Sequence, residues 1–508
     1  MKTRAIVFQK ENLKRCSREK KMARLLEQLE KNTQLDKVIY KHDLMPEEEL
    51  TAKQVWEYSD KLAFYLNETY KEDKSPIVVY GHKHPFMLVY FLACVKSGRA
   101  FCPVDVNTPI DRVRDIAATV KSPIVFVSEA IELDTPIMTV DEAKNIITQT
   151  KERVSKEDYV KDEDIFYIIF TSGSTGKPKG VSITYANLNH FLDCDGKGPQ
   201  VFLGHPPFSF DLSVMSLWPA LYMHIPLVQI DKEHLQDFKV LFKTLEESKA
   251  TVWISTPSFA EMCLADPSFN GDLLPELEQF VFCGEKLFSS TVEKLMERFP
   301  KAEVVNTYGP TESTVMVTWM PLTKELVERY PDNLPVGVVK PGTTVLIDGE
   351  NSGEIIIYGN TVAKGYYENP EMNQKHFFEV DGERAYRTGD VGHFEGELLF
   401  CEGRIDFQIK LHGHRIELED IDNNLLKNPK IRQAATVPSF ADGKVKSITS
   451  FVVYNEPIEK RFETVKLVKK ELAQHVPEYM IPKKVVFLDE MPLNNNGKID
   501  KKQLKELV

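Results

Sequence analysis

The sequence predicts an α/β protein: a large N-terminal domain of helix-covered, mostly parallel sheets with a β-rich subdomain, then a small α+β domain. Three observations predict this fold class. Strand-like apolar runs alternate with helical periodicity over residues 22–330, which is typical of parallel sheets covered by helices. Residues 331–403 change to glycine turns and short alternating strands. A separate α+β pattern begins after Gly403.

Size, charge and cysteine use narrow the class of protein. The chain has 508 residues, 42% hydrophobic and 28% charged, which is ordinary for globular domains. The net charge of −12 argues against a nucleic-acid partner. The longest apolar run, 86–95, is too short for membrane insertion. Seven dispersed cysteines without a Cys-x-x-Cys pair fit free thiols, so we expect a cytoplasmic protein.

The first 21 residues form a separate segment. They carry eight Lys or Arg against two Glu and lack the apolar core of a signal peptide. We interpret residues 1–21 as a basic arm that is disordered or extraneous. Helical spacing begins near Met22, so we assign residues 22–403 to the large domain, with 331–403 as its β-rich subdomain, and 404–508 to the small domain.

Residues 22–165 contain the first alternating elements. The predicted helices are 56–66 and 85–96, and the predicted strands are 76–80, 100–104, 121–127 and 137–140. The run His82-Lys83-His84 could suggest a metal site, but its spacing is poor and a third ligand is missing. The sequence therefore favours a solvated loop there.

The remaining elements follow the same reading. Between 181 and 330 the predicted strands are 200–203, 226–230, 251–255 and 279–282, and the predicted helices are 184–192, 241–248 and 289–299. The clearest strand of the β-rich subdomain is 353–358. In the small domain we predict strands at 407–411, 433–437 and 447–453, and helices at 418–427 and 462–472.

A glycine-rich loop follows the apolar run 165–170, which reads as a buried strand. Residues 171–180 contain three glycines, four hydroxyls and two lysines. Glycine lets the backbone approach a ligand, and successive N–H groups in such a turn bind anions. The loop thus indicates a phosphate site. It is not a Walker loop, because Pro178 follows Gly176-Lys177. A flexible surface turn is the alternative.

Two further stretches place single reactive side chains near predicted strand ends. Asp211 lies between apolar runs, where it either caps the following helix or is a buried anion that would accept a substrate ammonium. Cys283 ends a strand before a glycine turn, where ligands commonly bind in open α/β sheets, although inert core packing is the alternative.

The stretch Asn306–Val315 is the second strong signal. Tyr308 can stack on a base, Thr311 can donate to phosphate, and Glu312 offers oxygen to Mg²⁺. A plain turn at Gly309-Pro310 is the alternative. Three weaker signals come later in the chain. Asp390 is a carboxylate after a turn that can bind ribose hydroxyls. Arg404 is a cation near the presumed linker, and Lys498 is a lysine that follows a glycine.

These segments, taken in order from about Met22 to the end, resemble the adenylate-forming enzymes, and within them the family of D-alanine–D-alanyl carrier protein ligases. The resemblance rests on the motifs Thr171–Gly180, Pro207–Met215, Ser255–Cys263, Phe282–Glu285, Asn306–Glu312 and Phe407–Gly413. It implies ATP-dependent activation of D-alanine to D-alanyl-AMP with release of pyrophosphate. Transfer to the phosphopantetheine thiol of a D-alanyl carrier protein would follow, for D-alanylation of lipoteichoic acid in the Gram-positive cell wall.

The resemblance also implies a role for each site residue. Thr171 and Ser172 would contact the ATP phosphates, and Asp390 would bind ribose. Adenine and the α-phosphate would be held by Asn306, Thr307, Tyr308, Gly309, Pro310 and Thr311, and the nucleotide would be flanked by Cys401, Glu402, Gly403 and Arg404. Glu312 would recruit Mg²⁺. Asp211 would pair with the D-alanine ammonium, while Cys283 and Val315 would enclose its methyl group. Lys498 would bridge the substrate carboxylate and the α-phosphate.

The chemistry needs no protein nucleophile, because the substrate carboxylate attacks the α-phosphate. We expect catalysis through positioning and positive charge, from Mg²⁺ at Glu312, Lys498 and the loop N–H groups. In the family the mobile small domain then rotates about a hinge, here Asp406, to admit the thiol. The chain ends without a carrier domain after Lys498, so we expect a separate carrier protein.

Two departures and two alternatives stay open. The basic arm lies outside the family pattern, and His414 stands where an aromatic or polar residue is usual; a metal-binding pair with His412 is disfavoured because no further ligand is near. The nearest alternative function is another AMP-forming ligase, either an acyl-CoA synthetase or a free-standing amino-acid adenylation protein. The second is an inactive nucleotide-binding scaffold, against which Lys498, Glu312 and Asp390 argue.

Overall fold

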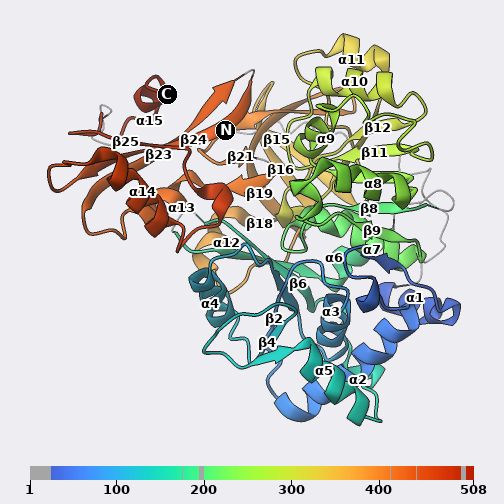
Figure 1. Ribbon diagram of the computed structural model, residues 1–508. Coiled ribbons are helices and arrows are strands. Elements are labelled where there is room, and N and C mark those ends of the chain that lie inside the picture. Colours follow the sequence, from blue (N-terminus) through green and yellow to red (C-terminus); the bar gives the residue numbers. More distant parts are fainter. Residues whose placement is uncertain (1–23, 174–175, 194–199, 412, 442, 494–498) are drawn as a thin grey trace. The chain divides into compact units, whose positions relative to one another are not determined.

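The computed structural model describes residues 24–173, 176–193, 200–411, 413–441, 443–493 and 499–508 (Figure 1). The chain divides into two compact units. The first contains the described residues up to Asp105, Val120–Ile169 and Val181–Ile405, and the second contains Val106–Thr119, Phe170–Gly180 and Asp406–Val508. The arm 1–21 lies outside the described residues, and the assignment of 22–403 and 404–508 to two domains stays a prediction.

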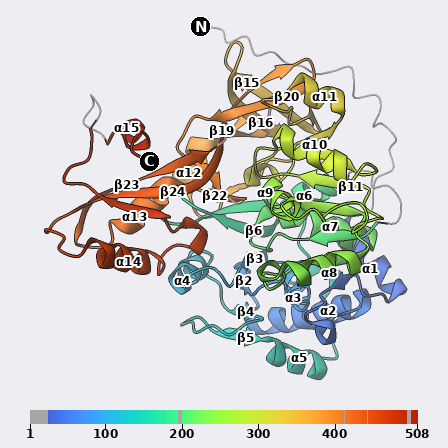
Figure 2. The same ribbon diagram turned by 45° about the horizontal axis from the view of Figure 1, so that its top comes forward.

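A seven-stranded sheet occupies the N-terminal part of the chain. Its strand order is β17 (Gly365–Tyr366), β7 (Lys179–Thr184), β6 (Ile165–Thr171), β3 (Phe101–Val104), β2 (Ile77–Tyr80), β4 (Val125–Val127) and β5 (Ile137–Thr139). The strands β6, β3, β2, β4 and β5 are parallel and follow one another in Figure 2. The predicted strand 121–127 is shorter in the structure, where it begins at Val125, and the left-handed φ of 52° at Lys121 does not fit a strand.

A second sheet has eight strands. Its order is β1 (Tyr40–Lys41), β9 (Leu227–Gln229), β8 (Phe202–Gly204), β10 (Val252–Ser255), β11 (Gln279–Phe282), β12 (Glu303–Asn306), β13 (Thr318–Leu322) and β14 (Val338–Val339). All pairs from β1 to β12 are parallel, whereas β13 and β14 pair antiparallel. The register places Ser255, Phe282 and Asn306 side by side at the carboxyl ends of the central strands.

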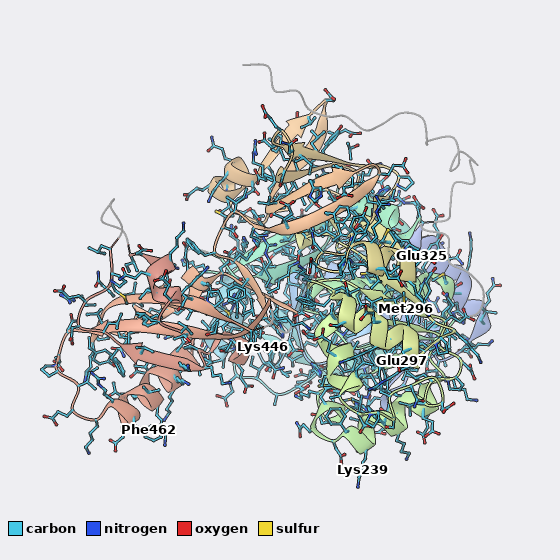
Figure 3. The ribbon with its side chains drawn as sticks, turned by 90° about the horizontal axis from the view of Figure 1, so that it is seen from above. Lys239, Met296, Glu297, Glu325, Lys446 and Phe462 are labelled. Atoms are coloured by element: carbon cyan, nitrogen blue, oxygen red, sulfur yellow. The ribbon has the colours of Figure 1, made fainter. Side chains whose placement is uncertain are left out.

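Amphipathic helices cover one face of this second sheet. Helices α8 (Phe238–Ser248), α9 (Pro257–Leu264) and α10 (Ser289–Arg298) lie along β8–β12 in Figure 1. Their apolar faces, with Leu245 and Leu295, pack on sheet residues such as Trp253 in one buried cluster. Glu297, on the opposite face of α10, points outward in Figure 3. This spacing of apolar residues is what makes a surface helix.

The helix α3 (Met87–Lys96) has no polar face at all. Every one of its residues is buried, because it is apolar all round and packs in the main core of the first unit. It contacts α2 (Ala52–Tyr70), which starts at a capping box formed by Thr51 and Gln54. The other helices of the first unit are α1 (Leu25–Asn32), α5 (Val140–Gln149), α6 (Tyr185–Leu192), α7 (Val214–Met223), α11 (Lys324–Arg329) and α12 (Pro370–His376).

The first unit has a third sheet, which lies between Thr343 and Arg404. It consists of β15 (Thr343–Asp348), β16 (Gly353–Gly359), β19 (Glu383–Glu395), β18 (Phe377–Val380) and β20 (Leu398–Arg404), all antiparallel. The hairpin β19–β20 pairs Asp390 with Arg404 in register. Two side chains that the sequence separates by a turn are thereby placed on neighbouring strands.

The second unit has its own α+β core. It contains the hairpin β21 (Ile409–Leu411) and β22 (His414–Ile416), and a sheet of β23 (Ile431–Ala441), β24 (Lys444–Tyr454) and β25 (Lys484–Phe487). Its helices are α4 (Ile110–Thr119), α13 (Leu418–Leu425), α14 (Arg461–Leu472) and α15 (Lys501–Lys505). Figure 3 shows Phe462 of α14 projecting from the surface, where 72% of the residue is exposed.

The α/β fold class is confirmed. Among the residues that the structure describes, we find no helix with the length and apolarity that a bilayer crossing requires.

Candidate active site

The site begins where three parallel strands of the eight-stranded sheet end together. The backbone N–H of Cys283 donates to Ser255 O at 3.4 Å, and the N–H and Oγ1 of Thr307 both donate to Phe282 O at 2.9 and 2.8 Å. All three strands therefore end at the same edge of the sheet, which is where ligands bind in open α/β sheets. The structure thus brings the stretch around Cys283 and the stretch 306–315 to one place.

The segment that carries Asp211 lies against the turn after Cys283. Gly284 has a φ of 94°, and a Cβ added there would lie 3.5 Å from the Phe210 ring and 3.5 Å from the Thr256 methyl group. Asp211 follows Phe210 directly and is only 6% exposed. Because burial raises the pKa of Tyr167, with the nearby Asp211 charge adding to the effect, that phenol stays neutral beside the carboxylate.

Asp211 does not cap the helix that follows. It is the first residue of a short 3₁₀ turn, Asp211–Ser213, and the N-cap of α7 is Ser213, without a side-chain cap hydrogen bond. The capping interpretation is therefore wrong. Asp211 is a buried carboxylate in the segment next to the turn after Cys283, and a buried charge is stable only with hydrogen bonds or a countercharge.

Cys283 and Val315 meet directly. The Cys283 thiol donates to Val315 O at 3.6 Å, and both residues are buried. Val315 and its neighbour Thr314 have left-handed φ values of 61° and 53°. The lack of a side chain at Gly309 lets its backbone approach that of Val315, because a Cβ there would lie 2.6 Å from Val315 O. A β-branched residue at positive φ is strained, and such strain is concentrated at functional sites.

Glu312 is fully buried, with 0% exposure. The Tyr366 hydroxyl donates to Glu312 Oε1 at 2.7 Å and lies 3.2 Å from the Tyr386 hydroxyl. The backbone carbonyl of Glu312 accepts from Ala363 N at 2.9 Å, so the residue is fixed from both sides. A single oriented carboxylate fits Mg²⁺, which takes one or two protein carboxylates and completes its shell with phosphate oxygens and water. Among the described residues, no group of three or more His, Cys, Asp or Glu side chains is placed to hold a metal ion.

Asp390 accepts one hydrogen bond on each oxygen. The Tyr308 hydroxyl donates to Oδ2 at 2.6 Å, and Arg404 Nη1 donates to Oδ1 at 2.6 Å. Burial, and then the Asp390 charge, raise the pKa of Tyr308, so it remains a donor. An ionised carboxylate has about four acceptor positions, so each oxygen can also accept a ribose hydroxyl. Asn306 is held through Nδ2, which donates to Pro335 O at 2.9 Å.

The strand β20 carries the four residues expected along the nucleotide. Cys401 is partly exposed, and Glu402 accepts a hydrogen bond from the Ser352 hydroxyl at 2.6 Å. Gly403 has a φ of 154°, and nothing lies within 4 Å of the place that its Cβ would take. Arg404 connects this strand to Asp390, as described above.

The glycine-rich loop belongs to the second unit. Ser172 Oγ donates to Arg415 O and accepts from Glu417 N, both at 3.0 Å, and the Thr171 hydroxyl donates to Lys179 O at 3.5 Å. Lys179 pairs with Glu417 at 3.1 Å, where both side chains are buried or nearly so. The hydroxyls of Thr171 and Ser172 thus make backbone hydrogen bonds within this unit.

Four predicted positions are absent from the contacts above: Lys498, His412, Asp406 and His414. Lys498 and His412 lie outside the described residues. Asp406 accepts a hydrogen bond from Gln408 N at 3.1 Å, and the hinge assignment is tested by no contact in the structure. His414 stacks on Tyr479 with 3.7 Å between the ring centroids.

Sequence reasoning missed Tyr366 and Tyr386. The Tyr366 hydroxyl binds Glu312, 54 residues earlier in the chain, and the Tyr386 hydroxyl lies against that of Tyr366. A tyrosine after a glycine turn is too common a pattern to single out. Sequence reasoning also placed Lys83 in a solvated loop, and this is wrong: the residue is 1% exposed.

Comparisons with known proteins show the family of the chain. The family model described as "AMP-binding enzyme" matches residues 26–367, and the model "AMP-binding enzyme C-terminal domain" matches residues 420–498. The chain is 45% identical over 474 residues to the D-alanine–D-alanyl carrier protein ligase of Bacillus cytotoxicus, covering 90% of this chain and 94% of that one. The corresponding ligase of Bacillus anthracis is also 45% identical, over 473 residues, with the same coverage.

Solved structures show the same fold at lower identity. An NRPS protein containing adenylation and PCP domains matches with a TM-score of 0.80 and 24% identity, covering 95% of this chain and 84% of that one. The Vibrio cholerae adenylation domain AlmE, in complex with glycyl-adenosine-5'-phosphate, matches with a TM-score of 0.79 and 20% identity, covering 95% and 97%. The chain therefore belongs to the AMP-binding enzymes and, within them, to the family of the D-alanine–D-alanyl carrier protein ligases.

Proposed function

We propose that this protein joins D-alanine to AMP with release of pyrophosphate and then transfers the D-alanyl group to the phosphopantetheine thiol of a D-alanyl carrier protein, for D-alanylation of lipoteichoic acid. The observation that carries the proposal is the buried carboxylate of Asp211, which follows Phe210, whose ring lies next to the turn after Cys283. The names of the relatives, D-alanine–D-alanyl carrier protein ligases, support the substrate and the partner. Because ATP and a reduced thiol are needed, we place the protein in the cytoplasm.

Asp211 gives the site its preference for an amino acid. A buried carboxylate attracts a substrate ammonium, because the pair satisfies two charges that would each be costly alone. A fatty or acetyl substrate offers no such cation. Cys283 and Val315, which contact each other, would limit the amino-acid pocket to a small side chain. These features favour alanine over bulkier amino acids and over simple acids.

We assign the nucleotide to the part of the candidate site around Asp390. Asp390 would accept the ribose hydroxyls, with Tyr308 and Arg404 fixing its orientation. The backbone from Asn306 to Thr311 and the strand from Cys401 to Arg404 would flank adenine and the α-phosphate. Thr171 and Ser172 would donate to the phosphates.

The chemical step needs positive charge more than it needs a nucleophile. The D-alanine carboxylate attacks the α-phosphorus, the bond to the bridging oxygen breaks, and pyrophosphate leaves. Glu312 would hold Mg²⁺, which supplies charge stabilisation to the phosphate oxygens. Lys498 is assigned to bridge the two reacting anions, and Asp406 to the hinge that later admits the carrier thiol.

The test of this function is ATP–pyrophosphate exchange driven by a panel of acids. We expect exchange with D-alanine well above that with L-alanine, larger D-amino acids, acetate and fatty acids. Strongest exchange with acetate or a fatty acid would favour an acyl-CoA synthetase, and with a different amino acid another adenylation protein. No exchange with any acid would favour an inactive scaffold.

Cys283→Ala is expected to widen the amino-acid pocket. Removing the sulfur leaves space beside Val315. The kcat/KM for D-2-aminobutyrate, which has one more methylene, should therefore rise relative to that for D-alanine. The gain should be about tenfold in relative kcat/KM, since one methylene contributes about 1–3 kcal/mol to discrimination. The measurement is exchange kinetics with both amino acids. If their ratio does not change, Cys283 only packs the core. Cys263→Ala, another fully buried thiol at 0% exposure, is the control.

A further inference from the structure

The run His82-Lys83 follows strand β2 and carries a buried lysine with no role in the site described above. Lys83 is 1% exposed and has a φ of 54°. Its Nζ donates to Gly204 O at 3.3 Å, to His205 O at 2.5 Å and to Ile230 O. These carbonyls lie at the ends of the neighbouring parallel strands β8 and β9. A single ammonium group, on a loop that follows a strand of the first sheet, therefore binds carbonyls at the ends of two strands of the second sheet.

A network of two buried acids and two histidines lies next to this lysine, since His82 precedes it in the chain and the charges of Asp231 and Asp105 act on it. His82 Nδ1 lies 2.5 Å from Asp105 Oδ2, and its Nε2 lies 2.9 Å from Asp231 Oδ1. His42 Nε2 lies 3.0 Å from Asp231 Oδ2. Burial lowers the pKa of Lys83 to about 8, and the charges of Asp231 and Asp105 prevent a larger drop. Lys83 is therefore mostly protonated near neutral pH and can donate to all three carbonyls.

The segment that Lys83 holds through the carbonyl of His205 leads directly to Asp211. His205 accepts from Lys83, and only Pro206 to Phe210 separate it from the carboxylate. The middle of this segment is held as well: the Phe208 ring lies 6.1 Å from that of Tyr40 and 5.4 Å from that of Phe91. The Tyr40 hydroxyl in turn donates to Lys83 O at 2.7 Å. Lys83 and Tyr40 thus fix the segment 205–211 at its start and at its middle.

We propose that Lys83 is a positioning residue for the amino-acid site: by holding the carbonyls of residues 204 and 205 it sets the place at which Asp211 meets the substrate ammonium. This inference rests on the proposed function, because it concerns the same carboxylate. Lys83 acts through the backbone and touches neither substrate. Small displacements of a positioning group have large kinetic effects, so the role is measurable.

The test compares two buried lysines. Lys83→Met keeps the length of the side chain and removes its charge and its hydrogen bonds. Lys96→Met is the matched control: Lys96 is 0% exposed and also makes three hydrogen bonds, to Trp56 O, Ser59 Oγ and Asp60 Oδ1 at 2.8–2.9 Å. All three partners lie on α2, away from the segment 204–211. Both variants should therefore lose thermal stability, and only one should affect the amino-acid site.

Pyrophosphate exchange by the full-length protein decides whether Lys83 positions the amino-acid site or only stabilises the fold. We expect Lys83→Met to raise the KM for D-alanine about tenfold while the KM for ATP stays unchanged. In Lys96→Met both KM values should match those of the wild type at a temperature where each protein is folded. An unchanged KM for D-alanine in Lys83→Met, or an equal rise in Lys96→Met, overturns the proposal.

A milder variant covers the case in which Lys83→Met does not fold. Tyr40→Phe keeps the ring against Phe208 and removes only the hydrogen bond to Lys83 O. A KM rise of about threefold for D-alanine alone supports the proposal, and an unchanged KM overturns it. The wild type is measured first. If it activates a different amino acid, the proposed function fails and the variants are compared with that amino acid.

Discussion

Asp211→Asn is expected to raise the KM for D-alanine by roughly a hundredfold while the KM for ATP changes little. Asparagine keeps the size of the side chain and removes its charge. The substrate ammonium would then enter a buried site without a countercharge, which costs about 3 kcal/mol or more. Since each 1.4 kcal/mol is about a factor of ten, the expected loss follows. ATP–pyrophosphate exchange over a range of D-alanine concentrations measures it.

Asp60→Asn is the control for this prediction. Asp60 is also buried, at 4% exposure, and pairs with Lys96 at 2.8 Å, but it lies on α2 outside the site. Its replacement should lower the melting temperature and leave the KM for D-alanine unaltered. A normal KM for D-alanine in Asp211→Asn would show that the ammonium binds elsewhere, and the assignment of the substrate pocket would have to be abandoned.

Glu312→Gln is expected to slow adenylation by about a hundred- to a thousandfold, because a charge-stabilising group of the transition state is lost. The variant should also need more Mg²⁺ for half-maximal exchange, since a neutral amide binds a hard dication more weakly than a carboxylate does. Exchange rates at saturating ATP and D-alanine, measured across a Mg²⁺ series, give both quantities. The expected signature is a lower maximum together with a shifted Mg²⁺ midpoint.

Tyr366→Phe separates the charge of Glu312 from its hydrogen bond. This variant removes the 2.7 Å hydrogen bond to Glu312 Oε1 but keeps the carboxylate. A hydrogen bond to a charged group contributes about 1.5–3 kcal/mol, so the rate should fall less than in Glu312→Gln and the Mg²⁺ midpoint should barely move. Equal losses in both variants, or an unshifted midpoint in Glu312→Gln, would argue that Glu312 holds the fold rather than the metal.

Much of the fold could be predicted because its signals are local. The strand 279–282 was predicted with the bounds that the structure shows, since an apolar run between turn residues is a strand signal within a few positions. Helix α9 was missed because Pro257 and Ser258 at its start resemble a loop, although proline is favoured at the first helical position. Strand β7 was missed because Lys179 and Gly180 were assigned to the glycine-rich loop.

The site was predictable only where a residue type suggested its own chemistry. Asp211, Glu312 and Asp390 are acids in unusual surroundings, and the structure buries all three. Lys83 could not be found in this way. A lysine is normally exposed, and two of the carbonyls that hold this one lie 121 and 147 residues away. Such a group is recognised only when the fold brings its partners together.

The left-handed backbone at Thr314 and Val315 sets stability against selectivity at one wall of the proposed amino-acid pocket. Left-handed residues other than glycine cost about 1–3 kcal/mol each, so the fold tolerates Val315 rather than favouring it. Glycine there would relax the main chain and enlarge the cavity at the same time. A variant of this protein selected for heat resistance alone would therefore tend to lose its discrimination among amino acids, and a screen for stability should monitor substrate choice at this position.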